Sequence, residues 1–275
     1  MSGSDRISPT AHYTGYTWAR HGLSHPELSS REGRILFESL RPVMVASRAL
    51  GGASLENYLL ARHRAIDALL ERAIEEHGIG QVMEVACGLS PRGWRFAERY
   101  GERITYVEAD LPEMASRKRD ALRRMGSLGA HHRVEEIDAL RDDGPESLAA
   151  LAGGLRQQDG LIVITEGLLG YLTDDQVRGL WRRLATVLGG FASGRYVSDL
   201  HIGEVQTPQV RAFRVLLSAF VRGQVHLHFE NPAQAREALL AAGYRTAEVH
   251  RAARLAPGQG GRGASMVHII EATTI

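Results

Sequence analysis

Apolar positions from residue 81 onward fall into short runs of strand length, and stretches with helical spacing separate most of these runs. The predicted strands lie at residues 81–87, 103–110, 131–140, 159–166, 194–202, within 231–252, and at 265–275. Because strands and helices alternate, the pattern predicts an α/β fold with a seven-stranded, mostly parallel sheet and helices on both faces. No helical stretch separates the last two strands, so we expect a final antiparallel pair.

The first 80 residues have a different pattern and predict an N-terminal helical arm. Helical spacing extends through residues 31–77, with an interruption at Gly51 and Gly52. Ser54 is a suitable N-cap for the second of these helices, and Gly78 is a suitable residue to end it. The core of the fold is therefore expected at residues 81–275.

Residues 8–28 combine aromatic and polar side chains. This mixture suits a lid over a small ligand, and it equally suits an arm that packs on the core. Within it, Tyr13, Tyr16 and Arg20 are our candidates for substrate contact. A second cap is expected at about 203–230, where an amphipathic helix is inserted between the fifth and sixth strands.

The turn after the first predicted strand consists of small residues. Ala86, Cys87 and Gly88 follow the strand, and Pro91 can occupy the first turn of the next helix. Small residues let the backbone approach a ligand, and ligands of open α/β sheets bind beyond the carboxyl ends of the strands. The GxGxxG dinucleotide fingerprint is absent, because position 86 is Ala and position 90 is Ser.

Acidic side chains follow several of the predicted strands. The second strand ends in Glu108 and Asp110, and an acid at this place can accept both hydroxyls of a ribose. Asp138 ends the third strand, and Glu166 follows the fourth in a turn flanked by glycine. Exposed acids at strand ends are the alternative interpretation. As ligand groups, all four would face the same crevice as the small-residue turn.

Composition limits the class of protein. At 275 residues one domain is expected, spanning 1–275. Lys and Arg number 33 against 32 Asp and Glu, so no nucleic acid or acidic membrane surface is expected as a partner. A single cysteine excludes an internal disulfide, and no signal segment or bilayer-spanning run is evident, which favours the cytoplasm. His226 and His228 lack an evident third ligand, so no metal is predicted.

Four blocks of the sequence resemble the leucine carboxyl methyltransferase family of class I S-adenosylmethionine-dependent methyltransferases, which includes O-methyltransferases of polyketide biosynthesis. YLLARHRAID is similar to the family's arginine-bearing helix, and EVACGLSPRGWR is similar to its ExGAGxDTRxxR loop. YVEADLPEMASRKR resembles the EVDxPxxxxxK block, and TEGLLGYLTDDQ resembles the EGVLxYL segment. The resemblance covers about residues 58–171 and implies a Rossmann-like sheet.

The resemblance implies roles toward S-adenosylmethionine. Arg62 would bind the carboxylate of the methionine moiety, and Ala86 and Gly88 would let the loop approach the cofactor. Asp110 would hold the ribose hydroxyls, with Glu108 as the second choice. The other cofactor candidates are Glu84 in the loop motif, Asp138 near the adenine, and Glu166 near the amino group or the sulfonium. Ser90-Pro91 replaces the family's Asp-Thr, so the side-chain contacts of the loop differ.

The implied activity is O-methylation of a small secondary metabolite, with S-adenosyl-L-homocysteine as the second product. A carboxylate acceptor is already ionised, whereas a hydroxyl acceptor needs a base, for which His201 is the candidate. Tyr171 would line the acceptor pocket. A protein C-terminal carboxylate is the alternative acceptor, and a cofactor-binding protein without turnover is the alternative activity. The oligomeric state is not predicted.

Overall fold

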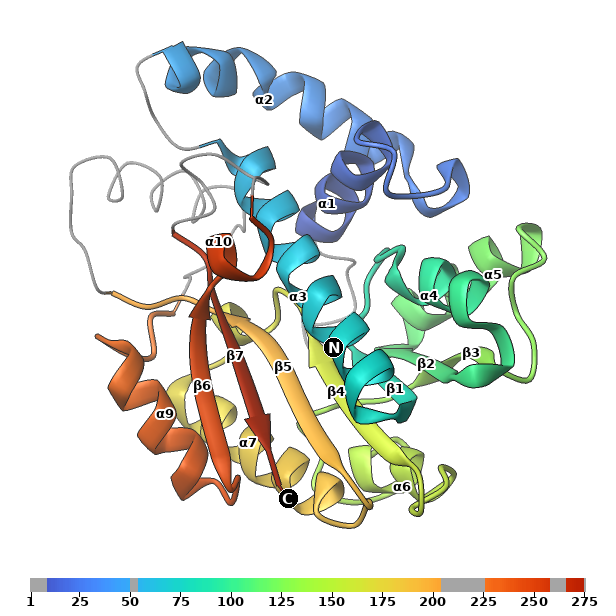
Figure 1. Cartoon of the computed structure of the whole chain (residues 1–275). Coiled ribbons are helices and arrows are strands. Elements are labelled where there is room, and N and C mark those ends of the chain that lie inside the picture. Colours follow the sequence, from blue (N-terminus) through green and yellow to red (C-terminus); the bar gives the residue numbers. More distant parts are fainter. Residues whose placement is uncertain (1–8, 50–53, 204–225, 258–265, 275) are drawn as a thin grey trace.

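The strands form a single sheet in the computed structural model, which describes residues 9–49, 54–203, 226–257 and 266–274. The seven strands are β1 (Ile79–Val85), β2 (Thr105–Asp110), β3 (His132–Glu136), β4 (Gly160–Thr165), β5 (Gly194–Leu200), β6 (Thr246–Arg251) and β7 (His268–Thr273). Their order is β3-β2-β1-β4-β5-β7-β6 (Figure 1). Neighbours from β3 to β5 are parallel, and β7 is antiparallel to both β5 and β6. The predicted sheet and its final antiparallel pair are confirmed.

Helices lie on both faces of this sheet (Figure 1). The α-helices are α1 (Pro9–Arg20), α2 (Arg31–Ala49), α3 (Leu55–His77), α4 (Arg92–Tyr100), α5 (Pro112–Arg124), α6 (Leu148–Gly153), α7 (Asp174–Leu188), α9 (Pro232–Ala241) and α10 (Ala252–Leu255). Short 3₁₀ helices are η1 (Pro26–Leu28), η2 (Gly101–Arg103) and η3 (Leu169–Tyr171). Ser54 caps α3 and Gly78 ends it in the left-handed conformation, both as predicted, and Thr173 caps α7.

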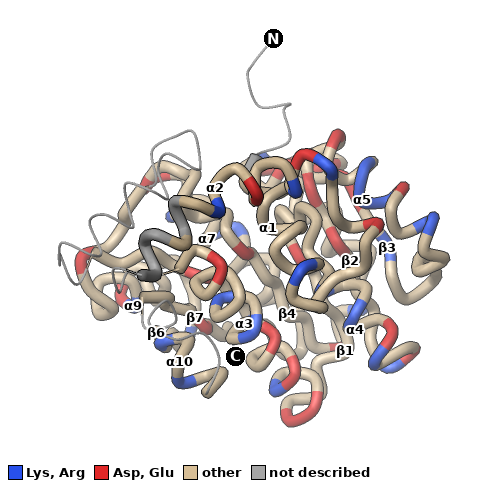
Figure 2. The backbone as a smooth tube through the Cα atoms, turned by 90° about the horizontal axis from the view of Figure 1, so that it is seen from above, with Lys and Arg blue, Asp and Glu red and all other residues tan. Residues whose placement is uncertain are grey.

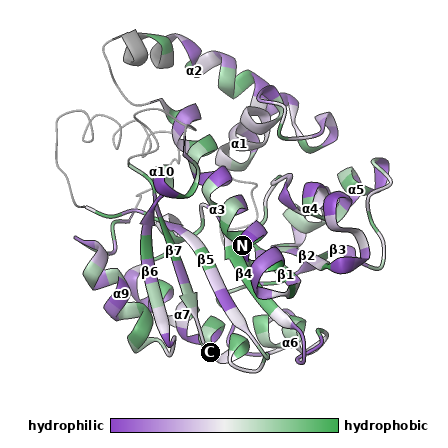
Figure 3. Ribbon diagram, in the orientation of Figure 1, coloured by the Kyte–Doolittle hydropathy of each residue, from purple (hydrophilic) through white to green (hydrophobic). Residues whose placement is uncertain are grey.

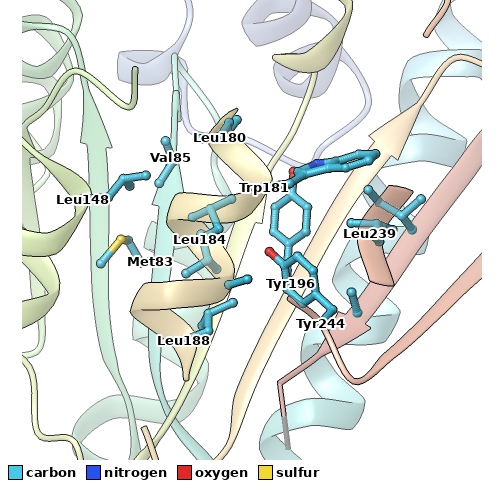
Figure 4. Packing of buried hydrophobic residues seen from close by; sticks show 14 of the residues in the cluster. Met83, Val85, Leu148, Leu180, Trp181, Leu184, Leu188, Tyr196, Leu239 and Tyr244 are labelled. Atoms are coloured by element: carbon cyan, nitrogen blue, oxygen red, sulfur yellow. The ribbon is translucent and has the colours of Figure 1, made fainter. Parts of the chain in front are cut away.

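The central strands are buried on both faces, as is usual for parallel sheets. Val82 and Ile162 pack with α3 and α4 on one face, whereas Met83 and Val163 pack with α6, α7 and α9 on the other. Figure 4 shows the second cluster, in which Trp181 of α7 lies beside Tyr196 of β5. Figure 3 shows apolar colour in the central strand β4, whereas the edge strand β6 is largely polar.

Two elements differ from the prediction made from sequence. The third strand is shorter than 131–140, because the backbone N–H of Asp138 donates to the carbonyl of Glu146 and its carboxylate accepts from Leu140 N, which folds the chain into a loop. Helix α10 was not predicted. The predicted insertion helix at 208–223 lies outside the described residues.

The N-terminal segment contributes both a cover and a part of the core. Helix α1 packs on α2, while α3 packs against the sheet through residues such as Leu59 and Ile66, which belong to the same cluster as Val82. Helix α3 therefore acts as a core helix, although residues 1–80 were predicted as one arm. The domain division itself stays a prediction.

Candidate cofactor site

The small-residue turn and the tip of β2 meet at the carboxyl edge of the sheet. The backbone N–H of Gly88 donates to Oδ2 of Asp110 at 2.7 Å, and Leu111 N donates to Oδ1 at 2.8 Å. A carboxylate has about four acceptor positions, so Asp110 keeps room for further hydrogen bonds. Burial raises the pKa of Asp110, although both backbone bonds oppose that effect. The structure thus brings two of the predicted cofactor residues together.

Ala86 adopts a conformation that normally selects glycine. Its φ is 54°, and among described non-glycine residues it has the only positive φ. Gly88 follows with φ 52°. Left-handed backbone costs roughly 1–2 kcal/mol for a residue with a Cβ atom, so the turn keeps its shape here at some cost in stability. The turn geometry of the glycine loop is therefore retained although its first glycine is replaced by alanine.

Arg62 is on α3, and its side chain reaches the carboxyl ends of β4 and β5. Its Nε donates to Oε1 of Glu166 at 2.9 Å, and its Nη1 donates to Oδ2 of Asp199 at 3.3 Å. Asp199 also accepts from the backbone N–H of Gly167 at 2.6 Å. Within the described part of the chain, Nη2 of Arg62 has no hydrogen-bond partner. The guanidinium is thus fixed by two carboxylates while one edge stays available for a third.

Arg92, at the start of α4, connects α3, β1 and the turn after β4. It is fully buried and binds Asp67 of α3 at 2.7 Å, Glu84 of β1 at 2.6 Å and Glu166 after β4 at 2.6 Å. His63 Nδ1 lies 2.9 Å from the same oxygen of Glu166. Three carboxylates on separate elements therefore share one guanidinium, and Arg92 fixes the position of Glu166 relative to β1.

Charges in this cluster nearly compensate one another. The arginines are Arg62, Arg92 and Arg95, and the carboxylates are Asp67, Glu84, Glu166 and Asp199. These four carboxylates exceed the three arginines by one charge, counted without His63. Although burial opposes it, the charges of His63, Arg92 and Arg62 hold the pKa of Glu166 well below its usual range. Glu166 is therefore ionised at neutral pH.

Glu108 is not a ribose ligand in this structure, which corrects its assignment as the second choice. Its side chain is completely buried, forms an ion pair with Lys118, and lies 2.7 Å from Nε2 of His132. Lys118 in turn donates to the carbonyl of Ser90 at 2.5 Å and so connects the turn to β2. A carboxylate enclosed in this way cannot reach a ligand, and it serves to hold the loop.

The assignment of Glu84 to the cofactor is likewise corrected. One of its oxygens binds Arg92, and the other accepts from the hydroxyl of Tyr106 at 2.7 Å. Glu84 is buried within β1 and supports Arg92. Asp138 lies next to the tip of β2, because Ile137 N donates to the carbonyl of Asp110 at 2.9 Å. Its role near the adenine stays a prediction, as does the contact of Glu166 with the cofactor.

The three residues assigned to substrate in the N-terminal segment all contact one side chain, Phe37 of α2. Tyr13 stacks on it at a centroid distance of 5.3 Å, Tyr16 lies at 5.2 Å, and the Arg20 guanidinium lies 5.2 Å from its centroid. These contacts give all three a packing role between α1 and α2. A role in substrate binding stays a prediction.

Helix α1 covers the cofactor turn closely. Gly15 lies so near to Leu89 and to the carbonyl of Leu28 that an added Cβ would contact both at 3.0–3.1 Å. A Cβ on Gly88 would lie 3.7 Å from Ala11. Trp18 of the same helix lies over His63, with ring centroids 4.7 Å apart. The segment predicted as a lid or a packed arm thus lies directly on the turn.

The predicted catalytic residues lie at the ends of β4 and β5. His201 follows β5, and its Nε2 is 2.9 Å from the hydroxyl of Tyr58. Tyr171 is in η3 after the β4 turn and is 41% exposed. His228 contacts Asp174 at 2.6 Å and the carbonyl of Leu169 at 2.9 Å, so both ring nitrogens are occupied. No group of three metal-binding side chains occurs among the described residues.

Sequence reasoning missed Arg92, Asp67 and Lys118. Helix α5 places Lys118 on one buried line with Met114 and Leu122. That four-residue spacing was a usable signal. Arg92 and Lys118 also occupy the arginine and lysine positions of the two family motifs, ExGAGxDTRxxR and EVDxPxxxxxK. A long cation inside a motif, next to small residues, can be buried when acids on other elements pair with it.

Basic and acidic positions are interspersed along the described backbone (Figure 2). No described helix combines the length and the apolar character needed to cross a bilayer.

Comparison with known proteins matches residues 28–185 to the model of the leucine carboxyl methyltransferase family. A Mycolicibacterium smegmatis protein named for S-adenosyl-L-methionine-dependent methyl transfer is 33% identical over 124 residues, which are 45% of this chain and 40% of that protein. The chain thus matches about two-fifths of the length of this relative.

Solved structures show the same fold at low identity. A DUF574 family protein from Streptomyces avermitilis has a TM-score of 0.64 at 16% identity, with 97% of both chains covered. PigF with SAH has a TM-score of 0.52 at 17% identity and covers 76% of this chain and 54% of its own. With more than half of its residues matched by the family model, the chain belongs to the leucine carboxyl methyltransferase family of class I S-adenosylmethionine-dependent methyltransferases.

Proposed function

We propose that this protein is an S-adenosylmethionine-dependent O-methyltransferase that acts on a carboxylate or hydroxyl of a small molecule. S-adenosylmethionine is the cofactor of the family to which the chain belongs. The observation that carries the proposal is the arrangement of Arg62, whose Nη2 is unpaired among described residues while two buried carboxylates fix the rest of its guanidinium.

The residues at the carboxyl edge fit the parts of this cofactor. Arg62 would bind the methionine carboxylate through Nη2, and Asp110 would accept the ribose hydroxyls beside the backbone of Gly88. S-adenosylmethionine carries a sulfonium, an ammonium and a carboxylate, so its methionine end has a net charge of +1. The ionised carboxylate of Glu166 would complement that charge.

S-adenosylmethionine, held by Arg62 and Asp110, would supply an electrophilic methyl group for an acceptor oxygen, with exchange of a carbon–sulfur bond for a carbon–oxygen bond. For a carboxylate acceptor the products are a neutral ester and a neutral thioether, and no proton has to leave. The protein then contributes position, with the acceptor oxygen held about 3–3.5 Å from the methyl carbon and in line with the breaking bond. For a hydroxyl acceptor one proton must leave, and His201 is the described base at the end of β5.

The position of α1 favours a small acceptor over a protein C-terminus. Gly15 and Ala11 pack on the cofactor turn, so an extended polypeptide would have to displace α1 to reach that side. A small molecule could enter with much less rearrangement. We therefore place the protein among enzymes of small-molecule metabolism, with a polyketide-like acid as the expected class of acceptor.

Two measurements test this proposal in sequence. Calorimetric titration with S-adenosylhomocysteine should give one site per chain, and a protein without that site would not be a methyltransferase of this class. A screen of aromatic and aliphatic acids and phenols with methyl-labelled cofactor should then yield labelled ester or ether. Tight cofactor binding without any transfer, including to peptides ending in a free carboxylate, would favour a binding protein without turnover.

A further inference from the structure

Helix α3 and the end of β5 are joined by two parallel contacts. Tyr58 precedes Arg62 by four residues, a rise of about 6 Å along a helix. Asp199 precedes His201 by two residues, about 6.6 Å along an extended strand. The two spacings match, so Arg62 reaches Asp199 at 3.3 Å while the Tyr58 hydroxyl lies 2.9 Å from His201 Nε2. The Tyr58 and His201 rings stack at a centroid distance of 6.0 Å.

The second ring nitrogen of His201 has a different environment. Nδ1 is buried and has no hydrogen-bond partner among the residues that the structure describes. The charged or titratable side chains near the ring are Tyr58, Asp199, Arg62, His228 and His268. Buried N–H groups and ring nitrogens are seldom left without a partner in native proteins. Nδ1 is therefore a position at which the hydrogen-bonding atom of a ligand is expected.

The contact with Tyr58 decides which nitrogen holds the proton. Burial lowers the pKa of His201, so the ring is neutral near pH 7 and carries one N–H. Burial and the nearby carboxylate of Asp199 raise the pKa of Tyr58, so the phenol keeps its proton. A phenol O–H is a stronger donor than a neutral imidazole N–H, and the imidazole lone pair is the stronger acceptor. The favoured bond runs from the Tyr58 hydroxyl to Nε2, which leaves the ring proton on Nδ1.

We propose that Tyr58 is a positioning residue that holds His201 in the Nδ1–H tautomer, and that this N–H donates to an oxygen of the methyl acceptor. The inference rests on the proposed methyltransferase function and deepens it. In this arrangement His201 orients an acceptor oxygen that arrives ionised, and it removes no proton. The nucleophile keeps its other lone pairs for the methyl carbon.

The tautomer can be measured without any acceptor. In protein labelled with ¹⁵N-histidine and saturated with S-adenosylhomocysteine, long-range ¹H–¹⁵N spectra should show the His201 proton on Nδ1. Tyr58→Phe should move the proton to Nε2 or mix the two forms. Tyr100→Phe, which removes a hydroxyl bound to Glu75, should leave the His201 tautomer unchanged. A wild-type proton on Nε2, or an unchanged tautomer in Tyr58→Phe, would overturn the role of Tyr58.

The acceptor contact is tested with benzoate and phenol as matched probes. Benzoate added to the same complex should shift the Nδ1–H resonance, whereas neutral phenol should shift it much less. His201→Ala should weaken benzoate binding about tenfold, the effect of losing a hydrogen bond to a charged group. His201→Asn, whose amide nitrogen occupies the place of Nδ1, should retain more of the affinity. No response of Nδ1 to benzoate overturns the acceptor contact.

The result is separable from the proposed function. Titration of S-adenosylhomocysteine into each variant measures cofactor binding, which does not depend on the tautomer of His201. A protein that fails to bind S-adenosylhomocysteine refutes the function. A protein that binds it but holds the His201 proton on Nε2 refutes only the inference about Tyr58.

Discussion

Replacement of Arg92 by methionine tests the buried cluster that positions the site. Arg92→Met keeps much of the apolar stem but removes the charge that Asp67, Glu84 and Glu166 share. Asp67 keeps Arg95 at 2.7 Å, and Glu166 keeps Arg62 at 2.9 Å, whereas Glu84 keeps only a tyrosine hydroxyl. Of the three carboxylates, Glu84 is therefore the one left without a cationic hydrogen-bond partner among the described residues.

The expected loss of unfolding free energy is about 3–5 kcal/mol, the usual cost of removing one partner from a buried ion pair. Native domains are stable by only about 5–15 kcal/mol, so the variant should unfold at a much lower urea concentration. Glu84→Gln in the same chain removes the uncompensated charge and should restore part of the loss. Arg99→Met is the matched control, because Arg99 lies on the same helix and its ion pairs are half exposed, where about 1 kcal/mol or less is expected.

The effect should also depend on pH. Arg92 is among the charges that lower the pKa of Glu166 and Asp67 against the effect of burial. A depressed carboxyl pKa stabilises the fold above the unfolded value, about 3.9–4.3, and that contribution is lost as pH falls through the folded pKa. The difference in unfolding free energy between wild type and Arg92→Met should be largest at pH 7 and should decrease below about pH 4. Equal unfolding midpoints of Arg92→Met and Arg99→Met at pH 7 would refute the reasoning.

Three further predictions concern the turn, the ribose acid and metals. Ala86→Gly should raise the unfolding free energy by about 0.5–1 kcal/mol in urea titrations, because φ 54° costs alanine more than the added chain entropy costs glycine; a lower midpoint would count against a strained turn. Asp110→Asn should weaken S-adenosylhomocysteine binding about tenfold in calorimetry, and unchanged affinity in folded protein would exclude Asp110 as the ribose ligand. Once an acceptor is known, turnover should survive exhaustive EDTA treatment; activity restored specifically by a divalent ion would contradict this prediction.

The fold was predictable because its signals are local. Buried strand runs, the caps Ser54 and Thr173, and the stop at Gly78 are each encoded within a few residues. The place of Asp110 at the tip of β2 also followed from the local pattern, whereas its role toward the ribose stays a prediction. The hydrogen bond from Gly88 N to Asp110 connects two of these locally encoded features, the small-residue turn and the acid at the tip of β2.

The buried ion pairs could not be predicted in the same way. Arg92 contacts residues 25, 8 and 74 positions away along the chain, and no local pattern specifies these partners. Glu108 and Asp110 have the same chemistry and the same strand face, and only the positions of Lys118 and His132 decide that Glu108 is enclosed. The pairing of Tyr58 with His201 likewise depends on how α3 lies against β5.

The most direct test of the cofactor site is a titration of S-adenosylhomocysteine into wild type, Arg62→Met and Arg64→Met, repeated with a decarboxylated analogue. Arg62→Met should bind S-adenosylhomocysteine about tenfold more weakly than wild type, because a charge-assisted hydrogen bond through Nη2 is lost. The analogue should bind both proteins equally, and Arg64→Met should match wild type. Circular dichroism must show that each variant is folded. If folded Arg62→Met binds S-adenosylhomocysteine like wild type, the assignment of Arg62 to the methionine carboxylate is wrong.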